Sequence, residues 1–222
     1  GTLSNGLAHY LGDEIHHADR HPFLVHRIDK NTSGLLLVAK DEESTRFLGE
    51  QFKDHSILRK YHALVWGSPT EREGTIETNI TRSNQNRKIF TTTMDSEVGK
   101  HAITHYKVIE DFTYVSLIEC QLETGRTHQI RVHMKHIGHP LFSDSTYGGD
   151  NIRKGVVFSK YKQFVENCFA LLPRQALHAK TLGFVHPKTK ESLFFESDLP
   201  NDMAQVIQKW RDVSGTYDFN NG

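Results

Sequence analysis

Between residues 57 and 122, five segments with β-type composition follow one another along the chain. Clusters of Gly, Asp, Asn or Ser bound each of them, which is typical of strands joined by turns. The segments are KYHALVWG (60–67), GTIETNI (74–80), KIFTTTM (88–94), AITHYKVIED (102–111) and TYVSLIECQL (113–122). This succession predicts an antiparallel meander and restricts the chain to folds built around a sheet.

Helical patterns lie on both sides of the β-rich stretch. Asp41 is placed to cap one helix. Thr127 is placed to cap another, which Gly138 and Pro140 would end. The predicted helices cover residues 3–11 with Gly12 as the stop, 41–54, 127–137 and 200–212.

Four more apolar segments are typical of strands. They are FLV (23–25), LLLVA (35–39), LHAKTLGFVHP (177–187) and SLFFES (192–197). No linker, repeat or low-complexity segment divides the chain. We therefore expect residues 1–222 to form one α+β domain around a mixed, mainly antiparallel β-sheet with flanking helices.

The charge balance gives no global attraction to polyanions. Lys plus Arg total 27 and Asp plus Glu also total 27, so binding of a nucleic acid would depend on local patches. Residues 81–90 and 151–164 lack acidic side chains and are candidates. Two cysteines are too few for a disulfide framework, and the longest apolar run, LLLVA, is far shorter than the ~20 residues of a membrane span. These features favour a reducing cytoplasm.

The segment HRIDKNTSGLLLVAK (26–40) places charged residues between two apolar runs. Charge beside a core is tolerated when it is paired or functional. Arg27 and Asp29 are two positions apart, so in an extended segment both side chains point the same way. Two interpretations stay open: a local salt bridge that steadies the loop, and a catalytic aspartate.

GRTHQIRVH (125–133) gathers cationic and polar side chains at a predicted helix start. The free N–H groups and the dipole of such an end favour anions. The set comprises Arg126, His128, Gln129, Arg131 and His133. A phosphate or carboxylate partner and a solvated surface helix are both compatible with it. The spacings from His128 through His133 and His136 to His139 are not those of a helical zinc site, so no metal is expected.

Three further residues are ambiguous by themselves. Tyr61, in RKYHALVWG (59–67), is typical of a half-buried strand tyrosine. Leu177 and His178 would pass as ordinary strand residues.

Taken together, these segments resemble the RluA-like family of RNA pseudouridine synthases, which carry an HRLD-type signature. HRIDKNTSGLLLVAK, RKYHALV, GRTHQIRVH with IGHP, and LHA followed by HP stand here in the family's order. The resemblance covers about residues 1–199. Family members usually carry an upstream strand ending in Lys-Pro-x-Gly, and often an S4-type RNA-binding domain, and both are expected to be absent from this chain.

The resemblance implies a role for each matching residue. Asp29 would be the essential aspartate, Arg131 its partner and Tyr61 the phenol in contact with the base. Arg27 would help to displace the target uridine, and Leu177 would pack against the base. The residues expected to contribute to substrate binding are Arg27, Arg126, Gln129, His133, Leu177 and His178.

The implied reaction is the isomerisation of uridines in structured RNA to pseudouridine. Ribosomal RNA is the favoured partner, and transfer RNA is also open. No metal or redox cofactor is needed, because bond breakage and bond formation balance within one molecule. Two alternatives remain: a non-catalytic RNA-binding or assembly module, and a glycoside-cleaving hydrolase, which would need a second carboxylate as general acid.

Overall fold

The chain folds around an eight-stranded sheet in a computed structural model that describes residues 3–11, 24–155 and 158–216. The strand order is β1-β7-β2-β6-β5-β3-β4, and β8 pairs with β7. Among the described strand pairs, only β1 and β7 run parallel to each other. The strands are β1 (Ser33–Gly34), β2 (Leu58–Trp66), β3 (Glu73–Arg82), β4 (Phe90–Thr93), β5 (Lys100–Asp111), β6 (Val115–Leu122), β7 (Leu177–Val185) and β8 (Ser192–Glu196).

The predicted mixed, mainly antiparallel sheet is confirmed, but its strand order is not a simple meander. β5 pairs with β3 along Glu73–Ile80, and β4 lies outside β3. The physical reason is length, because β4 has four residues whereas β3 and β5 have ten and twelve. A long pairing of β3 with β5 satisfies more backbone groups than β4 could.

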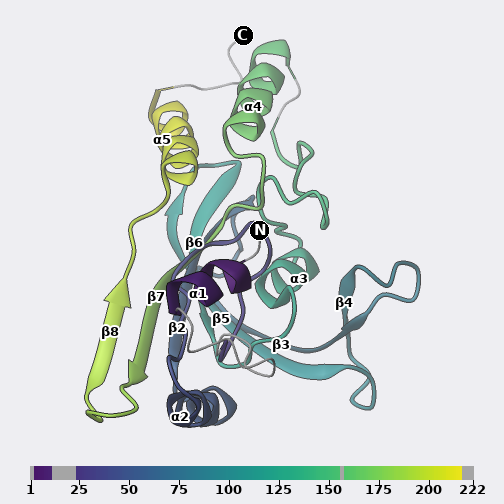
Figure 1. Cartoon of the computed structure of the whole chain (residues 1–222). Helices are drawn as coiled ribbons and strands as arrows, with labels where there is room; N and C mark the ends of the chain where they lie inside the picture. Colours follow the sequence, from purple (N-terminus) through teal and green to yellow (C-terminus); the bar gives the residue numbers. More distant parts are fainter. Residues whose placement is uncertain (1–2, 12–23, 156–157, 217–222) are drawn as a thin grey trace.

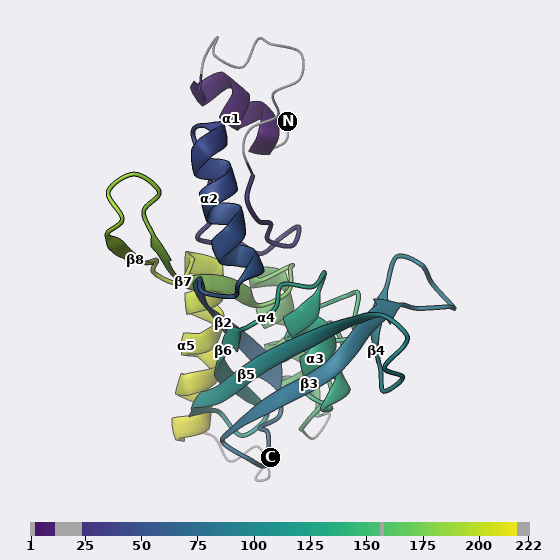
Figure 2. The same cartoon turned by 90° about the horizontal axis from the view of Figure 1, so that it is seen from below.

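Helices lie at both ends of the sheet and against it. Figure 1 shows α2 at one end and α4 beside α5 at the other, with α3 near β3 and β5. Figure 2 shows the same arrangement from below, with β4 projecting to one side. The helices are α1 (Leu3–Leu11), α2 (Glu42–Lys53), α3 (Gln129–His136), α4 (Ser159–Leu171) and α5 (Asn201–Thr216). No helix among the described residues is long and apolar enough to cross a membrane.

The two larger apolar clusters among the described residues hold α3, α4 and α5 to the sheet. Trp66 of β2 packs with Phe142, Cys168 of α4 and Trp210 of α5. The other cluster joins Ile130 and Met134 of α3 to Tyr61 of β2 and to β6. Full burial of side chains of this size stabilises the fold by about 1.5–3 kcal/mol each. The second cluster fixes α3 against β2, where the candidate site residues converge.

The cap at Asp41 is confirmed, whereas the cap at Thr127 is wrong. Asp41 Oδ1 accepts a hydrogen bond from the Ser44 N–H at 2.7 Å. At α3 the capping residue is His128, which has a left-handed φ of 58° and makes no side-chain capping bond. Gln129 instead turns back to accept the Arg126 N–H on its Oε1. The helix end is as expected, since Gly138 has a φ of +87°.

The segment 35–39 is not the predicted core strand. Pairing with β7 stops at Gly34, whose added Cβ would lie 2.3 Å from Ala179 O, and Leu35 N–H still donates to that oxygen. Leu37 N–H then donates to His26 Nε2 at 2.8 Å, so a side chain replaces a strand neighbour. Ala39 alone of this run is buried. Phe23 in the other predicted strand, and the stop at Gly12, lie outside the described residues.

Helix α4 had no counterpart among the predicted elements. Its sequence mixes basic and aromatic residues, which hides the helical stripe of Tyr161, Val165 and Cys168 that it buries. Tyr161 also donates its hydroxyl to Lys154 O at 2.6 Å. The stripe becomes recognisable only when α5 provides the surface against which it packs.

Candidate active site

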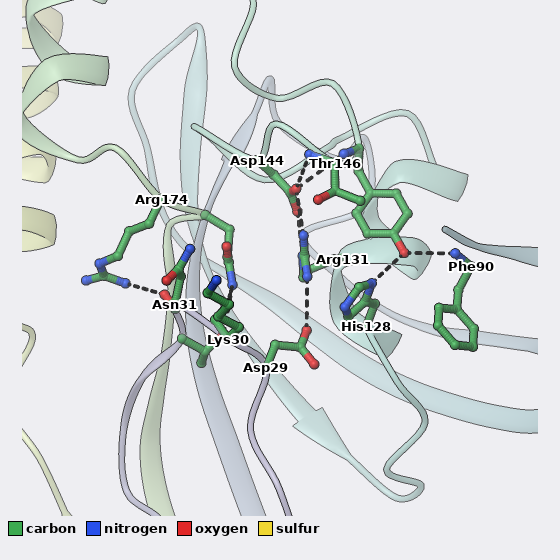
Figure 3. A network of polar contacts seen from close by, with 12 residues as sticks. Asp29, Lys30, Asn31, Phe90, His128, Arg131, Asp144, Thr146 and Arg174 are labelled. Atoms are coloured by element: carbon green, nitrogen blue, oxygen red, sulfur yellow. Dashed lines mark hydrogen bonds and ion pairs between the residues drawn. The ribbon is translucent and has the colours of Figure 1, made fainter. Parts of the chain in front are cut away.

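The two residues most strongly implied by the sequence, Asp29 and Arg131, contact each other across 102 residues of chain. Arg131 Nη1 donates to Asp29 Oδ2 at 3.3 Å (Figure 3). The Arg131 side chain is 5% exposed and the Asp29 side chain is 14% exposed. The carboxylate thus stays accessible while its cationic partner is buried behind it.

Arg131 is held chiefly by a second carboxylate, Asp144. Its Nε and Nη2 donate to the two Asp144 oxygens at 2.7 and 2.9 Å, and Asp144 Oδ1 also accepts the Thr146 and Tyr147 N–H groups (Figure 3). The guanidinium carbon lies 5.0 Å from the centre of the Tyr147 ring. This bidentate, stacked arrangement fixes the direction in which Nη1 points.

Charge and burial act against each other at Arg131. Burial disfavours its charged form, but the hydrogen bonds and charge of Asp144, followed by the charge of Asp29, raise the pKa of Arg131 above its ordinary value. The guanidinium therefore stays cationic at any physiological pH.

Asp144 was not among the residues predicted from the sequence. Its sequence context resembles that of Asp29, because an acidic residue follows apolar residues in LFSDSTYGG (141–149), where Leu141 and Phe142 are buried. Asp144 is 1% exposed. A charge so close to buried apolar residues implies a partner.

The loop that carries Asp29 is fixed by residues near the start of β7. Gln175 Nε2 donates to Lys30 O at 2.7 Å, and Arg174 Nη1 donates to Asn31 O at 3.1 Å (Figure 3). Arg174 is itself held by Asp202 of α5 through two bonds of 2.8 Å. The Asp29 backbone is thereby positioned by two distant elements.

A cavity of about 450 Å³ opens beside Asp29. That volume lies within the range of small-ligand sites. The expected site residues among its lining are Arg27, Asp29, Tyr61, Arg126, Gln129 and Leu177. Asp29 is the single carboxylate among the described lining residues.

Tyr61 lies in the cavity wall with a perturbed hydroxyl. Burial raises the pKa of Tyr61 to about 12, with Arg59 opposing the shift and Asp29 adding to it. This shift is in the wrong direction for a proton acceptor at neutral pH. The phenol is suited to packing and to donating a hydrogen bond.

Arg27 and Arg126 lie at the cavity without carboxylate partners among the described residues. Asp29 pairs with Arg131 rather than with Arg27, so the structure does not contain the local Arg27–Asp29 salt bridge. The Arg126 Nε donates to His101 O at 2.8 Å. Both guanidinium groups retain donors for an external acceptor.

Gln129 lines the cavity, but its amide is already satisfied. Its oxygen accepts from Thr124 and its nitrogen donates to Ile103 O and Thr104. The contacts assign Gln129 to shaping the turn before α3 rather than to direct recognition.

His133 and His178 are not brought to the cavity. His133 is fully buried, with its ring nitrogens bonded to Thr78 and Thr104. Burial lowers the pKa of His133 to about 4, so the ring is neutral. His178 contacts Ser33 and Ser197 at 3.0 and 2.8 Å and so connects β1 to the region after β8. The physical reason at α3 is helical, because residues two apart, such as Arg131 and His133, point about 200° apart.

His128 extends the network toward β4. Its Nδ1 lies 2.8 Å from the Tyr147 hydroxyl, which also accepts the Phe90 N–H at 3.2 Å (Figure 3). Burial is the main cause that lowers the pKa of His128. The arginine, its stacking tyrosine and the edge strand therefore form one connected unit.

Comparison with known proteins shows which family the chain is similar to. The model of the RNA pseudouridylate synthase family matches residues 12–136. A protein of Chlorobaculum parvum named "Uncharacterized RNA pseudouridine synthase" is 47% identical over 217 residues, which cover 96% of this chain and 66% of that protein. The ribosomal large subunit pseudouridine synthase D of Zymomonas mobilis is 41% identical over 209 residues, covering 93% and 62%.

A solved structure shares the fold. Human RNA Pseudouridylate Synthase Domain Containing 4 superimposes with a TM-score of 0.75 at 23% identity, over 95% of this chain and 84% of that one. The chain belongs to the RNA pseudouridylate synthase family. It spans roughly two thirds of the length of the two curated relatives described above.

Proposed function

We propose that this protein isomerises uridines in RNA to pseudouridine and that Asp29 is its catalytic carboxylate. The observation that carries the proposal is the accessible Asp29 carboxylate, directed into a cavity by a buried Arg131 that is itself fixed by Asp144. Family membership supports the reaction type. Residues 1–222 would form the catalytic domain.

The reaction needs the target uridine out of its helical stack. Extrusion costs a few kcal/mol, and least where the base already lies in a loop. Arg27, exposed at the cavity, is placed to help displace the base. Leu177 and Tyr61 would then pack against the uracil.

The ionised Asp29 would either attack C1′ of the ribose or assist departure of the base by another route. The C1′–N1 bond breaks, the uracil rotates, and C5 forms the new bond to C1′. The proton lost from C5 balances the one gained at N1, so the product is an isomer. With its pKa near 12, Tyr61 stays protonated, and we assign removal of the C5 proton to the Asp29 carboxylate.

A hydrolase is less well supported by the cavity. Glycoside cleavage by paired carboxylates needs a second acid beside the nucleophile. Asp144 cannot supply it, because it is 1% exposed and committed to Arg131.

The substrate is proposed as ribosomal RNA, with transfer RNA as the alternative. The name of the Zymomonas relative specifies the large ribosomal subunit. Mapping pseudouridines in total RNA from cells with and without the gene would identify the modified site. We also propose a reducing compartment, the cytoplasm, because both Cys120 and Cys168 are free and buried.

Asp29→Asn tests the catalytic assignment. The amide keeps the size of the side chain but removes its charge, so we expect pseudouridine formation to fall at least about 1,000-fold, the order expected when nucleophilic catalysis is removed. Tritium release from [5-³H]uridine-labelled RNA measures it. A non-catalytic RNA-binding module predicts instead that Asp29→Ala changes stability while function is kept.

A further inference from the structure

Arg59 differs from Arg131, the other buried arginine of the described residues, in having no anionic partner. It is 7% exposed, yet it forms no ion pair with any described carboxylate. Its Nη2 donates to the backbone oxygen of Glu123 at 3.0 Å, while the Glu123 carboxylate contacts His105. Its Nε is buried without any acceptor. The guanidinium carbon lies 5.4 Å from the centre of the Phe52 ring, but burying a charge without an anionic partner is still costly.

This guanidinium faces the same cavity as Asp29. Arg59 and Tyr61 are two apart on β2, so both side chains leave the same face of the sheet. Both line the cavity, together with Lys53 and His55 at the end of α2. Gly125 leaves room for the fork, because a Cβ there would lie 2.8 Å from Arg59 Nη1.

The chemistry of the cavity specifies the kind of ligand. Four permanent cations line it, namely Arg27, Lys53, Arg59 and Arg126, against the one carboxylate of Asp29, which already has Arg131. A neutral uracil carbonyl would leave the charge of Arg59 uncompensated. A phosphate oxyanion would compensate it and accept the planar fork.

We propose that Arg59, with Lys53 and His55 at the rim, binds the phosphodiester next to the target uridine. This inference rests on the proposed function and deepens it. Recognition then has two points, the nucleoside at Asp29 and Tyr61 and the flanking phosphate at Arg59. The phosphate contact would hold the extruded nucleotide in the cavity without reading the sequence.

The test uses the pentaribonucleotide AAUAA, which contains one uridine, and versions with an uncharged methylphosphonate at either linkage that flanks it. Wild-type protein should bind the parent about tenfold more tightly than one of the two neutral versions, as expected for a lost charge-assisted bond. Arg59→Gln should bind all three alike. Arg46→Gln, which removes a cation on α2 outside this cavity, is the matched control and should keep the wild-type preference.

A second variant covers the chance that Arg59→Gln unfolds the protein. Gly125→Ala should displace Nη1 and reduce the preference for the charged linkage, whereas Gly49→Ala, which meets no atom within 4 Å, should not. Thermal unfolding verifies that each variant is folded. Equal binding of the charged and neutral linkages by wild-type protein would overturn the inference.

The outcomes also separate this inference from the proposed function. Replacing the uridine by cytidine in AAUAA tests whether the cavity selects uridine. Uridine preference without any linkage effect would refute the phosphate contact alone. Loss of both would count against the phosphate contact and the proposed function together.

Discussion

Arg131, which holds Asp29, and Arg59, which lines the cavity, are almost equally buried, yet of the two only Arg131 contacts described carboxylates. Arg131 contacts two carboxylates and the face of an aromatic ring. Arg59 also lies over an aromatic ring, that of Phe52, but it contacts no described carboxylate; it donates to one backbone oxygen, and its Nε has no acceptor. A fully compensated guanidinium can hold a neighbouring group in place, whereas an uncompensated one gains stability when an anion arrives. This contrast supports the two proposed roles, in which Arg131 positions Asp29 and Arg59 binds a phosphate of the substrate.

The strongest test of this contrast removes the negative charge of Asp144, which holds Arg131. Asp144→Asn keeps the shape but deletes the charge, so we expect the free energy of unfolding to fall by about 3 kcal/mol, as for a broken buried pair. Turnover should fall about 100-fold, mainly in kcat, because Nη1 no longer points reliably at Asp29. Urea unfolding and steady-state kinetics measure the two effects.

Glu110→Gln is the matched control for Asp144→Asn. Glu110 also holds an arginine through two bonds of 2.7 Å, to Arg211, but that pair is largely exposed. We expect a loss below about 1 kcal/mol and unchanged turnover. Equal effects of the two substitutions would show that the buried pair has no special role.

A smaller effect is expected from Arg131→Lys. The ammonium keeps the charge but cannot contact both Asp144 oxygens and Asp29 from one plane. Activity should fall about 10- to 100-fold, the equivalent of one or two charge-assisted bonds. If turnover stayed at the wild-type level, the planar fork would be irrelevant and a point charge would suffice at this position.

The last prediction concerns the pH dependence of stability that arises from His133, a buried residue outside the cavity lining. The pKa of His133 is about 4 in the folded protein and ~6.5 when unfolded. Because the pKa of His133 is lower in the folded state, its contribution to the free energy of unfolding is complete above pH ~6.5 and is lost as the pH falls toward 4. Its ceiling is about 3 kcal/mol.

Urea unfolding between pH 7 and pH 4 should show this loss for wild-type protein and a flatter profile for His133→Gln. His9→Gln alters an exposed histidine of α1 and should leave the wild-type profile unchanged. A wild-type slope in His133→Gln would rule out His133 as the origin of the pH dependence.

The sequence predicted the strands of residues 57–122 and 177–197 well, because their composition and turn residues are local signals. It predicted Asp29 and Arg131 only through several ordered motifs, since nothing local connects residues 102 positions apart. Asp144 was missed because its partner lies on another element. His133 and His178 were expected at the site because they stand in the matching motifs GRTHQIRVH and LHA, whereas their ring nitrogens bond to residues outside the cavity lining.

The failures at 35–39 and α4 have a common physical origin. Leu37 satisfies its N–H through the His26 ring, and α4 buries its stripe against α5. The segment 35–39 depends on an unusual acceptor, the His26 ring, and α4 depends on a partner helix that is distant in sequence. Propensity alone favours the commoner local solution in each case.

The hydrogen bonds from Arg174 and Gln175 to the loop of Asp29 affect the order in which the site is completed during synthesis on the ribosome. Asp29, Tyr61 and Arg131 all emerge before the two side chains that hold the carbonyls of Lys30 and Asn31. β1 can pair only after its partner β7 has been synthesised, and Arg174 can pair only after Asp202 has been synthesised. The proposed site residues are therefore synthesised well before the residues between 174 and 202 that complete their positioning.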